Sequence, residues 1–343
     1  MTKKEFKIHF KHPSIIILSF LLLFLVVFFT SFFVGRYPIK PSQLVLVLLS
    51  RIFPIEQSWS NTVESIILNV RLPRILSSAI IGAALSISGL SYQGMFKNPM
   101  VSPDVLGTSA GAGFGASLGI LLGLSYLSIS LVSFIFGLVA VILVTFISSK
   151  LMNQKTLALI LGGIMISSLF GSSTSFIKLV ADTDNTLPAI TYWLMGSLSS
   201  VRKTDVYFLL IVTVIGVIPL FLLRWKLNLL TLDEDEAKSL GINTVFLRKI
   251  VIFCATLITS ASISVGGHIG WIGLVIPHFT RMLVGCDYRI SLPVSILMGS
   301  SFLMLVDTIS RSIATSEIPI GILTSFIGAP FFLYLMVRES KKV

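Results

Sequence analysis

The residues most able to do chemistry in this sequence are charged side chains in or beside long apolar runs. Arg71 and Arg74, in the sequence RLPR, are three positions apart, and Asp307 and Arg311 are four apart. Positions three or four apart share one face of a helix, so each pair presents its charges together. A charge is costly inside a bilayer, and a guanidinium group binds carboxylates through a bidentate fork. The spacing therefore predicts ion pairs, made either within the chain, to Asp307 or Glu64, or to carboxylates of a partner.

Other kinds of chemistry are poorly represented. The histidines, His9, His12, His268 and His278, have no metal-ligand spacing, and no Ser/His/Asp set is recognisable. The two cysteines also lack motif spacing, which argues against a disulfide framework or a metal site. The glycine-rich run at 107–119 lacks a Lys-Ser/Thr ending and a preceding strand, and the sequence has no Walker motif. An enzyme is therefore disfavoured, and any ATP hydrolysis belongs to another chain.

The elements that must position these residues are membrane spans. Hydrophobic residues make up 54% of the chain, charged residues make up 12%, and the mean hydropathy is +0.95. This composition is too apolar for a soluble domain. The net charge of +11 does not indicate nucleic-acid binding, because most basic residues lie in short loops beside apolar runs, as the positive-inside rule describes.

About 20 apolar residues are needed to cross a bilayer, and this rule predicts an all-α, polytopic bundle of about ten transmembrane helices. The whole chain, 1–343, forms one transmembrane domain with both termini in the cytoplasm, and its first apolar run shows no cleavage site. Seventeen of the 26 basic residues then lie inside and nine outside. The predicted spans are 14–34, 62–91, 105–122, 126–149, 156–180, 205–223, 249–266, 270–284, 291–313 and 318–337, with a short outer helix around 192–198.

One polar segment, residues 224–249, interrupts the spans. It holds four successive acids, Asp233 to Glu236, between basic ends, so it must be solvated, and the basic ends place it in the cytoplasm. Thr231 or Asp233 can cap a short helix there, the acids suit its first turn, and Gly241 suits its end. The sequence is equally consistent with an ordinary solvated loop and with a helix on which a partner protein docks.

Small residues gather in several spans, most clearly in the fifth. Ser167, Ser168, Ser172 and Ser175 follow one another at three- to four-residue spacing, roughly on one side of a helix. Such a face can pack closely against another helix, because small residues allow close approach in lipid. It can also line a path for a solute, and the sequence leaves both interpretations open.

Several long motifs resemble those of the permease subunits of ABC importers for iron siderophores and vitamin B12. In the first half, the resemblance lies in RLPRILSSAIIGAALSISGLSYQGMFKNPMVSPDVLGTSAGAG. In the second half, it lies in YWLMGSL, LDEDEAKSLGI, GGHIGWIGLVIPHFTRMLVGCDYRISLP and VDTISRSI, followed by EIPIGILTSFIGAPFFLYL. The match covers nearly the whole chain from about residue 60.

The resemblance implies a multi-pass subunit of the bacterial cytoplasmic membrane that binds no cofactor itself. A second permease subunit, identical or not, completes the path, two cytoplasmic ATPase subunits use ATP-Mg to drive it, and an extracytoplasmic binding protein delivers the ligand. The third, fifth, eighth and tenth spans are then expected to line the path. The resemblance assigns docking of the binding protein to Arg71, Arg74 and Arg311. It assigns coupling to the ATPase to Asp233, Glu234, Ala237, Leu240 and Gly241. It assigns the path and its cytoplasmic gate to Thr156, Leu157, Ser168, Ser172 and Ser175.

We therefore expect a permease that forms the translocation path for a ferric siderophore. Haem or a cobalamin is the alternative ligand within the same family. The alternative from another class is a secondary transporter, which needs coupling acids or histidines inside the membrane. Asp307 is the one clear candidate for such a role, and it has a cation four residues away. A membrane enzyme is disfavoured further by the missing catalytic set.

Overall fold

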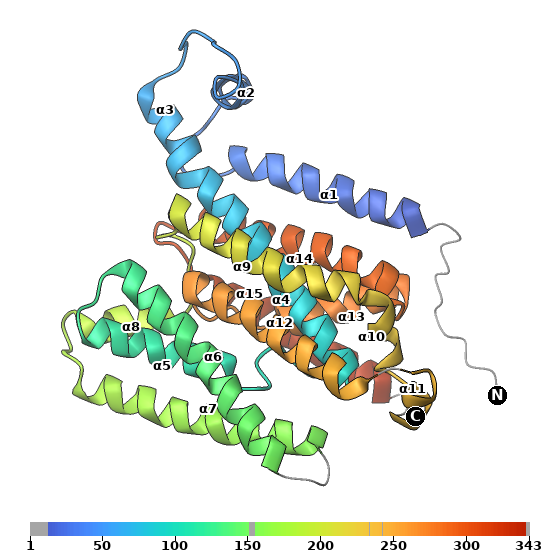
Figure 1. The fold of residues 1–343 in the computed structure, drawn as a ribbon. Coiled ribbons are helices and arrows are strands. Elements are labelled where there is room, and N and C mark those ends of the chain that lie inside the picture. Colours follow the sequence, from blue (N-terminus) through green and yellow to red (C-terminus); the bar gives the residue numbers. More distant parts are fainter. Residues whose placement is uncertain (1–12, 151–154, 233, 242, 341–343) are drawn as a thin grey trace.

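The computed structural model describes residues 13–150, 155–232, 234–241 and 243–340, and the regular elements within these ranges are all helices (Figure 1). Seven helical stretches are long and apolar enough to cross a membrane. Two shorter apolar helices and the 14-residue helix α5 bring the set to ten. The prediction of an all-helical, polytopic bundle is confirmed.

The helices follow one another with short connections. Those of the first half are α1 (Pro13–Phe33), α2 (Pro41–Leu49), α3 (Asn61–Ser65), the π-helical turn η1 (Ile66–Arg71), α4 (Leu72–Met95), α5 (Thr108–Leu121), α6 (Tyr126–Lys150) and α7 (Lys155–Val180). Those of the second half are α8 (Thr186–Leu194), α9 (Lys203–Leu222), α10 (Arg224–Leu229), α11 (Glu234–Ser239), α12 (Thr244–Gly266), α13 (Ile272–Val284), α14 (Tyr288–Ser310) and α15 (Ile320–Ser340).

Helix α4 lies at the centre of the bundle and packs against α14, α12, α13 and α9. The most apolar part of the Asn61–Met95 span is 89% buried, compared with 28% for α7 and 22% for α1. Glycines allow this packing, because a Cβ atom on Gly82 would collide with the main chain of Gly299 in α14. A Cβ atom on Gly89 would collide with Gly273 in α13 in the same way. Small residues therefore bring these helices into close contact, as expected within a membrane.

Local signals explain where the structure departs from the predicted boundaries. The outer helix α8 ends at Leu194 instead of continuing to 198, because Gly196 takes a left-handed conformation with φ +75°. Helix α5 begins at Thr108, after a turn that ends at Gly107 with φ +80°. Helix α12 begins five residues earlier than predicted, because the side chain of Asn243 accepts a hydrogen bond from the Phe246 N–H at 3.0 Å.

The π-helical turn η1 lies directly before Pro73. Proline has no N–H to donate, so the regular hydrogen-bond ladder is interrupted there. The N–H of Leu72 bonds instead to the carbonyl of Ile67, five residues back. This wider turn lies between the buried part of α4 and the short helix α3.

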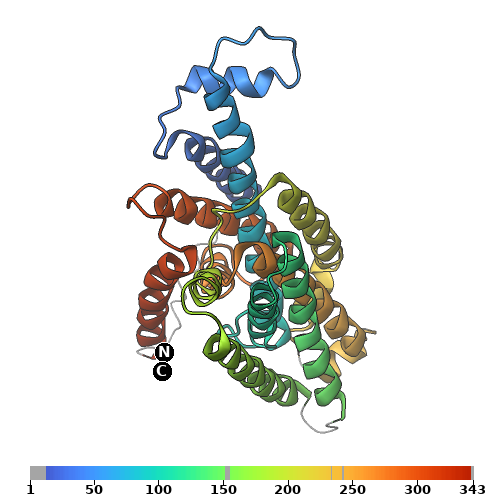
Figure 2. The same ribbon diagram turned by 90° about the vertical axis from the view of Figure 1, so that its left-hand side faces the viewer.

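The two ends of the molecule differ in character. Helices α10 and α11 lie at the end where α1 begins and α15 finishes, which we call the cytoplasmic end (Figure 1). At the opposite, outer end, α2 and α3 form an arm that stands away from the bundle (Figure 1). Seen from the outer end, this arm lies on one side of the bundle and α7 and α15 lie on the other (Figure 2). The predicted topology, with both ends of the chain on the cytoplasmic side, agrees with this arrangement.

Candidate functional site

The predicted charged residues meet at the outer end of α4 and α14. The exposed fractions of Arg71, Arg74 and Arg311 are only 4%, 5% and 7%, and that of Asp307 is 1%. The Nε atom of Arg74 donates to Asp307 Oδ1 at 2.7 Å. Its Nη1 atom donates to Glu317 Oε2 at 2.8 Å. One buried guanidinium group therefore lies between two carboxylates of the same chain.

The other two arginines close the end of α1. Arg71 donates hydrogen bonds to the carbonyl oxygens of Phe32 and Tyr37, and Arg311 donates to the carbonyl of Ser31. The last carbonyls of a helix have no partner within the helix and carry partial negative charge, so cations are favourable there. Glu64, the other carboxylate proposed from the sequence, pairs with Arg51 instead. Internal pairing thus explains these buried charges, and direct contact of the three arginines with a binding protein stays a prediction.

Two of the membrane helices are too short to span the bilayer, so non-helical chain lies at membrane depth before each of them. Helix α5 has 14 residues and α13 has 13, so each is about 20 Å long and shorter than the hydrocarbon layer of about 30 Å. The loops before them, 96–107 and 267–271, complete the crossings. These loops come together, because a Cβ atom on Gly273 would collide with Pro103. Backbone that is not helical is tolerated at this depth only inside protein or beside water.

A polar hollow of about 250 Å³ lies where these two loops meet. Asp104 and His268 face each other there, with Nδ1 of His268 3.8 Å from Oδ2 of Asp104. The other oxygen of Asp104 accepts from the Ser109 N–H at 2.9 Å, in the first turn of α5. His268 also lines a second hollow, beside Gly321 and Ser325 of α15. The pair is therefore polar, partly exposed and adjacent to one of the helices predicted to line the path.

Sequence reasoning missed this pair. His268 was considered only as a metal ligand, and Asp104 lies in a stretch that apolar counting places at the edge of a span. The signal that was available is the pair of motifs NPMVSPD and GGHIG, in which prolines and glycines break a helix before a short apolar run.

We predict that Asp104→Asn and His268→Gln each lower ligand uptake about fivefold, because each removes one partner of a polar contact beside the path, and partly exposed contacts of this kind contribute about 1 kcal/mol. Asparagine can still accept the Ser109 N–H, so the start of α5 should survive. Ser109→Ala removes a neutral hydroxyl from the same hollow, keeps the main-chain N–H that bonds to Asp104, and serves as the control. Uptake in proteoliposomes and thermal unfolding of the purified protein test this. Wild-type uptake by both charge variants, or equal losses in the control, would refute a role for the pair.

The predicted serine face of α7 is mostly exposed. Ser168, Ser172 and Ser175 are exposed, together with Leu157. Ser167 differs, because its hydroxyl lies beside Gly107 in the loop before α5. The expectation that all four serines share one side is therefore wrong for Ser167, which packs within the chain.

The two residues predicted for the cytoplasmic gate, Thr156 and Leu157, lie in the first turn of α7 and face different sides of it. Leu157 is on the exposed face, whereas Thr156 lines a cytoplasmic hollow of about 290 Å³ with Arg248 and Lys249. The two residues therefore border different spaces in this conformation.

The predicted coupling segment forms two short helices, α10 and α11. Ala237 is buried in α11, Leu240 is exposed, and Gly241 follows with φ +76°, as expected of a residue that ends a helix. Thr231 does not cap α11, because its hydroxyl donates to the carbonyl of Asn228 at 2.6 Å. Asp233, the other proposed cap and coupling residue, lies outside the described residues, and Glu234 begins α11.

Asn228 ties the cytoplasmic segment to the bundle. Its amide nitrogen donates to Asp287 Oδ1 at 2.8 Å, and its amide oxygen accepts from the Tyr288 N–H at 2.9 Å. Tyr288, at the start of α14, donates its hydroxyl to the carbonyl of Leu90 in α4 at 2.9 Å. These hydrogen bonds join α10 to the start of α14 and, through Tyr288, to the central helix α4.

An all-helical membrane bundle with irregular loops at membrane depth, a polar hollow and a structured cytoplasmic segment defines a transport permease. A family model for the FecCD transport family matches residues 22–338. The chain belongs to this family, and it is a multi-pass permease subunit of an ABC importer in the bacterial cell membrane. Such subunits work with ATPase and permease partners.

Individual relatives agree with the family assignment. The molybdate import system permease protein MolB of Haemophilus influenzae is 37% identical over 94% of this chain and 95% of its own length. An iron chelatin transport system permease of Helicobacter pylori is 39% identical over 81% of this chain and 84% of its own. A solved structure of a metal-chelate type ABC transporter in an inward-facing conformation has a TM-score of 0.85 and 36% identity, over 95% of this chain and all of that one.

Proposed function

We propose that this permease carries a ferric siderophore along a path that it forms with a second permease subunit. An extracytoplasmic binding protein delivers the chelate at the outer end, and separate cytoplasmic ATPase subunits hydrolyse ATP-Mg to drive the cycle. The observation that supports this most strongly is the exposed face of α7, which runs the length of the bundle on the side opposite the arm (Figure 2).

The chemistry of that face favours a large chelate over a small oxyanion. Residues 157–177 of α7 and 320–337 of α15 contain no charged side chain. A small dianion such as molybdate loses its hydration in such surroundings without gaining a cation. A chelate encloses its metal ion in organic ligands and can meet leucine, methionine and serine side chains instead. Haem and a cobalamin fit the same face and are the alternative ligands.

A secondary transporter is disfavoured by the ion pair at Asp307. A coupling acid must bind and release a cation or proton during each cycle. Asp307 is instead buried against Arg74, with Arg311 Nε 3.7 Å from its other oxygen. The one acid proposed from the sequence for this role is therefore already neutralised by fixed charges.

The two ends of the bundle suit the proposed partners. Helix α11 and the Asn228 contacts give an ATPase a structured surface that is joined to the membrane helices. At the outer end, Glu317 of the arginine cluster remains 27% exposed in its side chain. We propose that the binding protein docks over this cluster, which includes Arg71, Arg74 and Arg311. Its first contact is with the exposed edge of the cluster, at Glu317.

Cysteine accessibility tests the path. In a background without Cys254 and Cys286, we expect Ser168→Cys, Ser172→Cys and Ser175→Cys to react with a charged, membrane-impermeant thiol reagent, because that face borders water. Ser167→Cys should be protected by the loop before α5. Ile211→Cys, on the exposed side of α9, is the control for a lipid-facing position and should not react.

The path assignment fails if all three serine positions stay protected in every nucleotide state. The ligand is tested separately, by uptake of radiolabelled ferric hydroxamate, haem and cobalamin into proteoliposomes that contain the assembled importer. Uptake of haem or cobalamin in place of the hydroxamate would replace the siderophore assignment and leave the path intact.

A further inference from the structure

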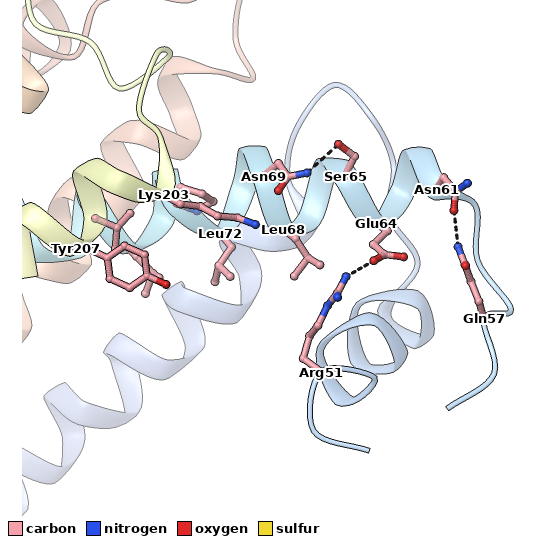
Figure 3. Close-up of a pocket in the computed structure, with 13 residues that line it drawn as sticks. Arg51, Gln57, Asn61, Glu64, Ser65, Leu68, Asn69, Leu72, Lys203 and Tyr207 are labelled. Atoms are coloured by element: carbon pink, nitrogen blue, oxygen red, sulfur yellow. Dashed lines mark hydrogen bonds and ion pairs between the residues drawn. The ribbon is translucent and has the colours of Figure 1, made fainter. Parts of the chain in front are cut away.

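A groove of about 720 Å³ lies at the outer end, between the helix α3–η1–α4 and the start of α9 (Figure 3). The helices that border it, α3–η1–α4 and α9, lie on the side of the bundle away from α7 (Figure 2). None of the residues assigned to transport above lines it. The groove is therefore separate from the proposed path.

The lining of the groove changes from polar to apolar along a single helix. Asn61, Glu64 and Ser65 line its outer part, Leu68 and Asn69 follow, and Leu72 and Leu76 line its inner part. The boundary falls near Leu72, where α4 enters the bundle. This order of polarity matches a lipid, whose headgroup lies outside its acyl chains.

A cation stands at the boundary between the two parts. Lys203, the first residue of α9, extends toward Leu68 across the groove (Figure 3). Among the described residues, its amine has no ion-pair partner, whereas Arg51 at the outer end is neutralised by Glu64. Tyr207 lines the groove one helical turn after Lys203 (Figure 3). A lysine and a hydroxyl group that line the same groove can each bind a phosphate oxygen.

The arm beside the groove carries large apolar side chains that the described chain leaves substantially exposed. Val45 and Leu49 of α2 are 52% and 38% exposed, and Ile52 and Phe53 after it are 75% and 56% exposed. Large apolar groups next to basic residues are typical of elements that lie in the interfacial region of a membrane. The arm thus places the groove at the level of lipid headgroups.

We propose that this groove binds an anionic phospholipid of the outer leaflet, with its phosphate at Lys203 and Tyr207 and an acyl chain along Leu72 and Leu76. The lipid fixes the arm against α9 and fills a space that side chains leave open. The proposal does not depend on the identity of the transported ligand.

Native mass spectrometry of the assembled, delipidated importer tests the proposal by titration with dioleoylphosphatidylglycerol. We expect Lys203→Gln to weaken binding about fivefold, because a cation near a membrane surface contributes about 1 kcal/mol. The start of α9 should persist, since the Arg202 N–H bonds to Asp205 at 2.8 Å without Lys203. Lys40→Gln, which removes an equal charge from the arm outside the groove, should bind the lipid like the wild type.

Two further measurements distinguish a lipid phosphate from a free phosphate. Glycerol 3-phosphate at millimolar concentration should not compete, because it has no acyl chain, and dioleoylphosphatidylcholine should bind more weakly. Equal binding by the wild type and Lys203→Gln would overturn the proposal. Competition by glycerol 3-phosphate would show an anion site instead. Protection of Tyr207→Cys from thiol labelling by a binding protein, but not by the lipid, would assign the groove to a protein.

Discussion

Asp307→Ala is expected to destabilise the protein by about 3 kcal/mol, because it removes one of the two carboxylates of buried Arg74 and the carboxylate beside buried Arg311. Arg74 Nε would lose its 2.7 Å contact, and Arg311 would lose the only carboxylate near its Nε atom among the described residues. Thermal or denaturant unfolding of the purified protein in detergent measures this effect. Glu317→Gln is the matched control and should cost less than about 1 kcal/mol, since Glu317 remains partly exposed.

A compensating variant separates the cost of an unpaired charge from the loss of packing. Arg74→Met combined with Asp307→Leu removes both charges and keeps apolar volume, and such replacements are often close to neutral. We therefore expect the double variant to be more stable than Asp307→Ala. A double variant as unstable as the single one would show that shape, rather than charge, is decisive at this position.

Ala237→Pro is expected to abolish ligand uptake while the permease still inserts and unfolds at its normal temperature. Proline inside a helix costs about 3 kcal/mol, which is enough to disrupt the six-residue helix α11. Motion of an ATPase would then no longer reach α10 and its contacts to α14. Uptake and ATP hydrolysis by the reconstituted importer, measured together, report the loss of coupling.

Ala237→Ser changes the same side chain without breaking the helix, and we expect it to retain most uptake. If Ala237→Pro transports at the wild-type rate, α11 is not part of the coupling path. Loss of the protein from the membrane would instead show that α11 is needed for folding, and the coupling assignment would then be withdrawn.

The helical architecture could be predicted from sequence because it depends on local patterns. Apolar length determines the spans, and proline, glycine and asparagine determine most ends, although Gly196 ended α8 earlier than predicted. The pairing of Asp307 with Arg311 was foreseen from their spacing of four residues. The 2.7 Å contact of Asp307 with Arg74 joins α14 to α4, and the sequence left open whether the arginines pair within the chain or with a partner.

The two helix-breaking motifs can be read from the sequence, but the meeting of Asp104 and His268 between them cannot, for a physical reason. Asp104 and His268 are distant in sequence and meet only because the loops before α5 and α13 enter the bundle from opposite ends. Hydropathy places these loops between spans and gives no information about which distant loops meet. The sequence left open whether the serine face of α7 packs or lines a path; Ser168, Ser172 and Ser175 are exposed, whereas the inward position of Ser167 depends on its contact with the loop at Gly107.

The short helices α5 and α13 also affect how the membrane voltage acts on a transported ion. Water that enters the hollow beside Asp104 and His268 replaces part of the insulating layer, so the voltage falls across the thinner part that remains. Moving one elementary charge through 100 mV involves about 2.3 kcal/mol, and most of that work is then done over a short distance next to the two loops. If the transported solute passes this hollow, its net charge decides whether the resting potential of the cell assists or opposes the ATP-driven step there.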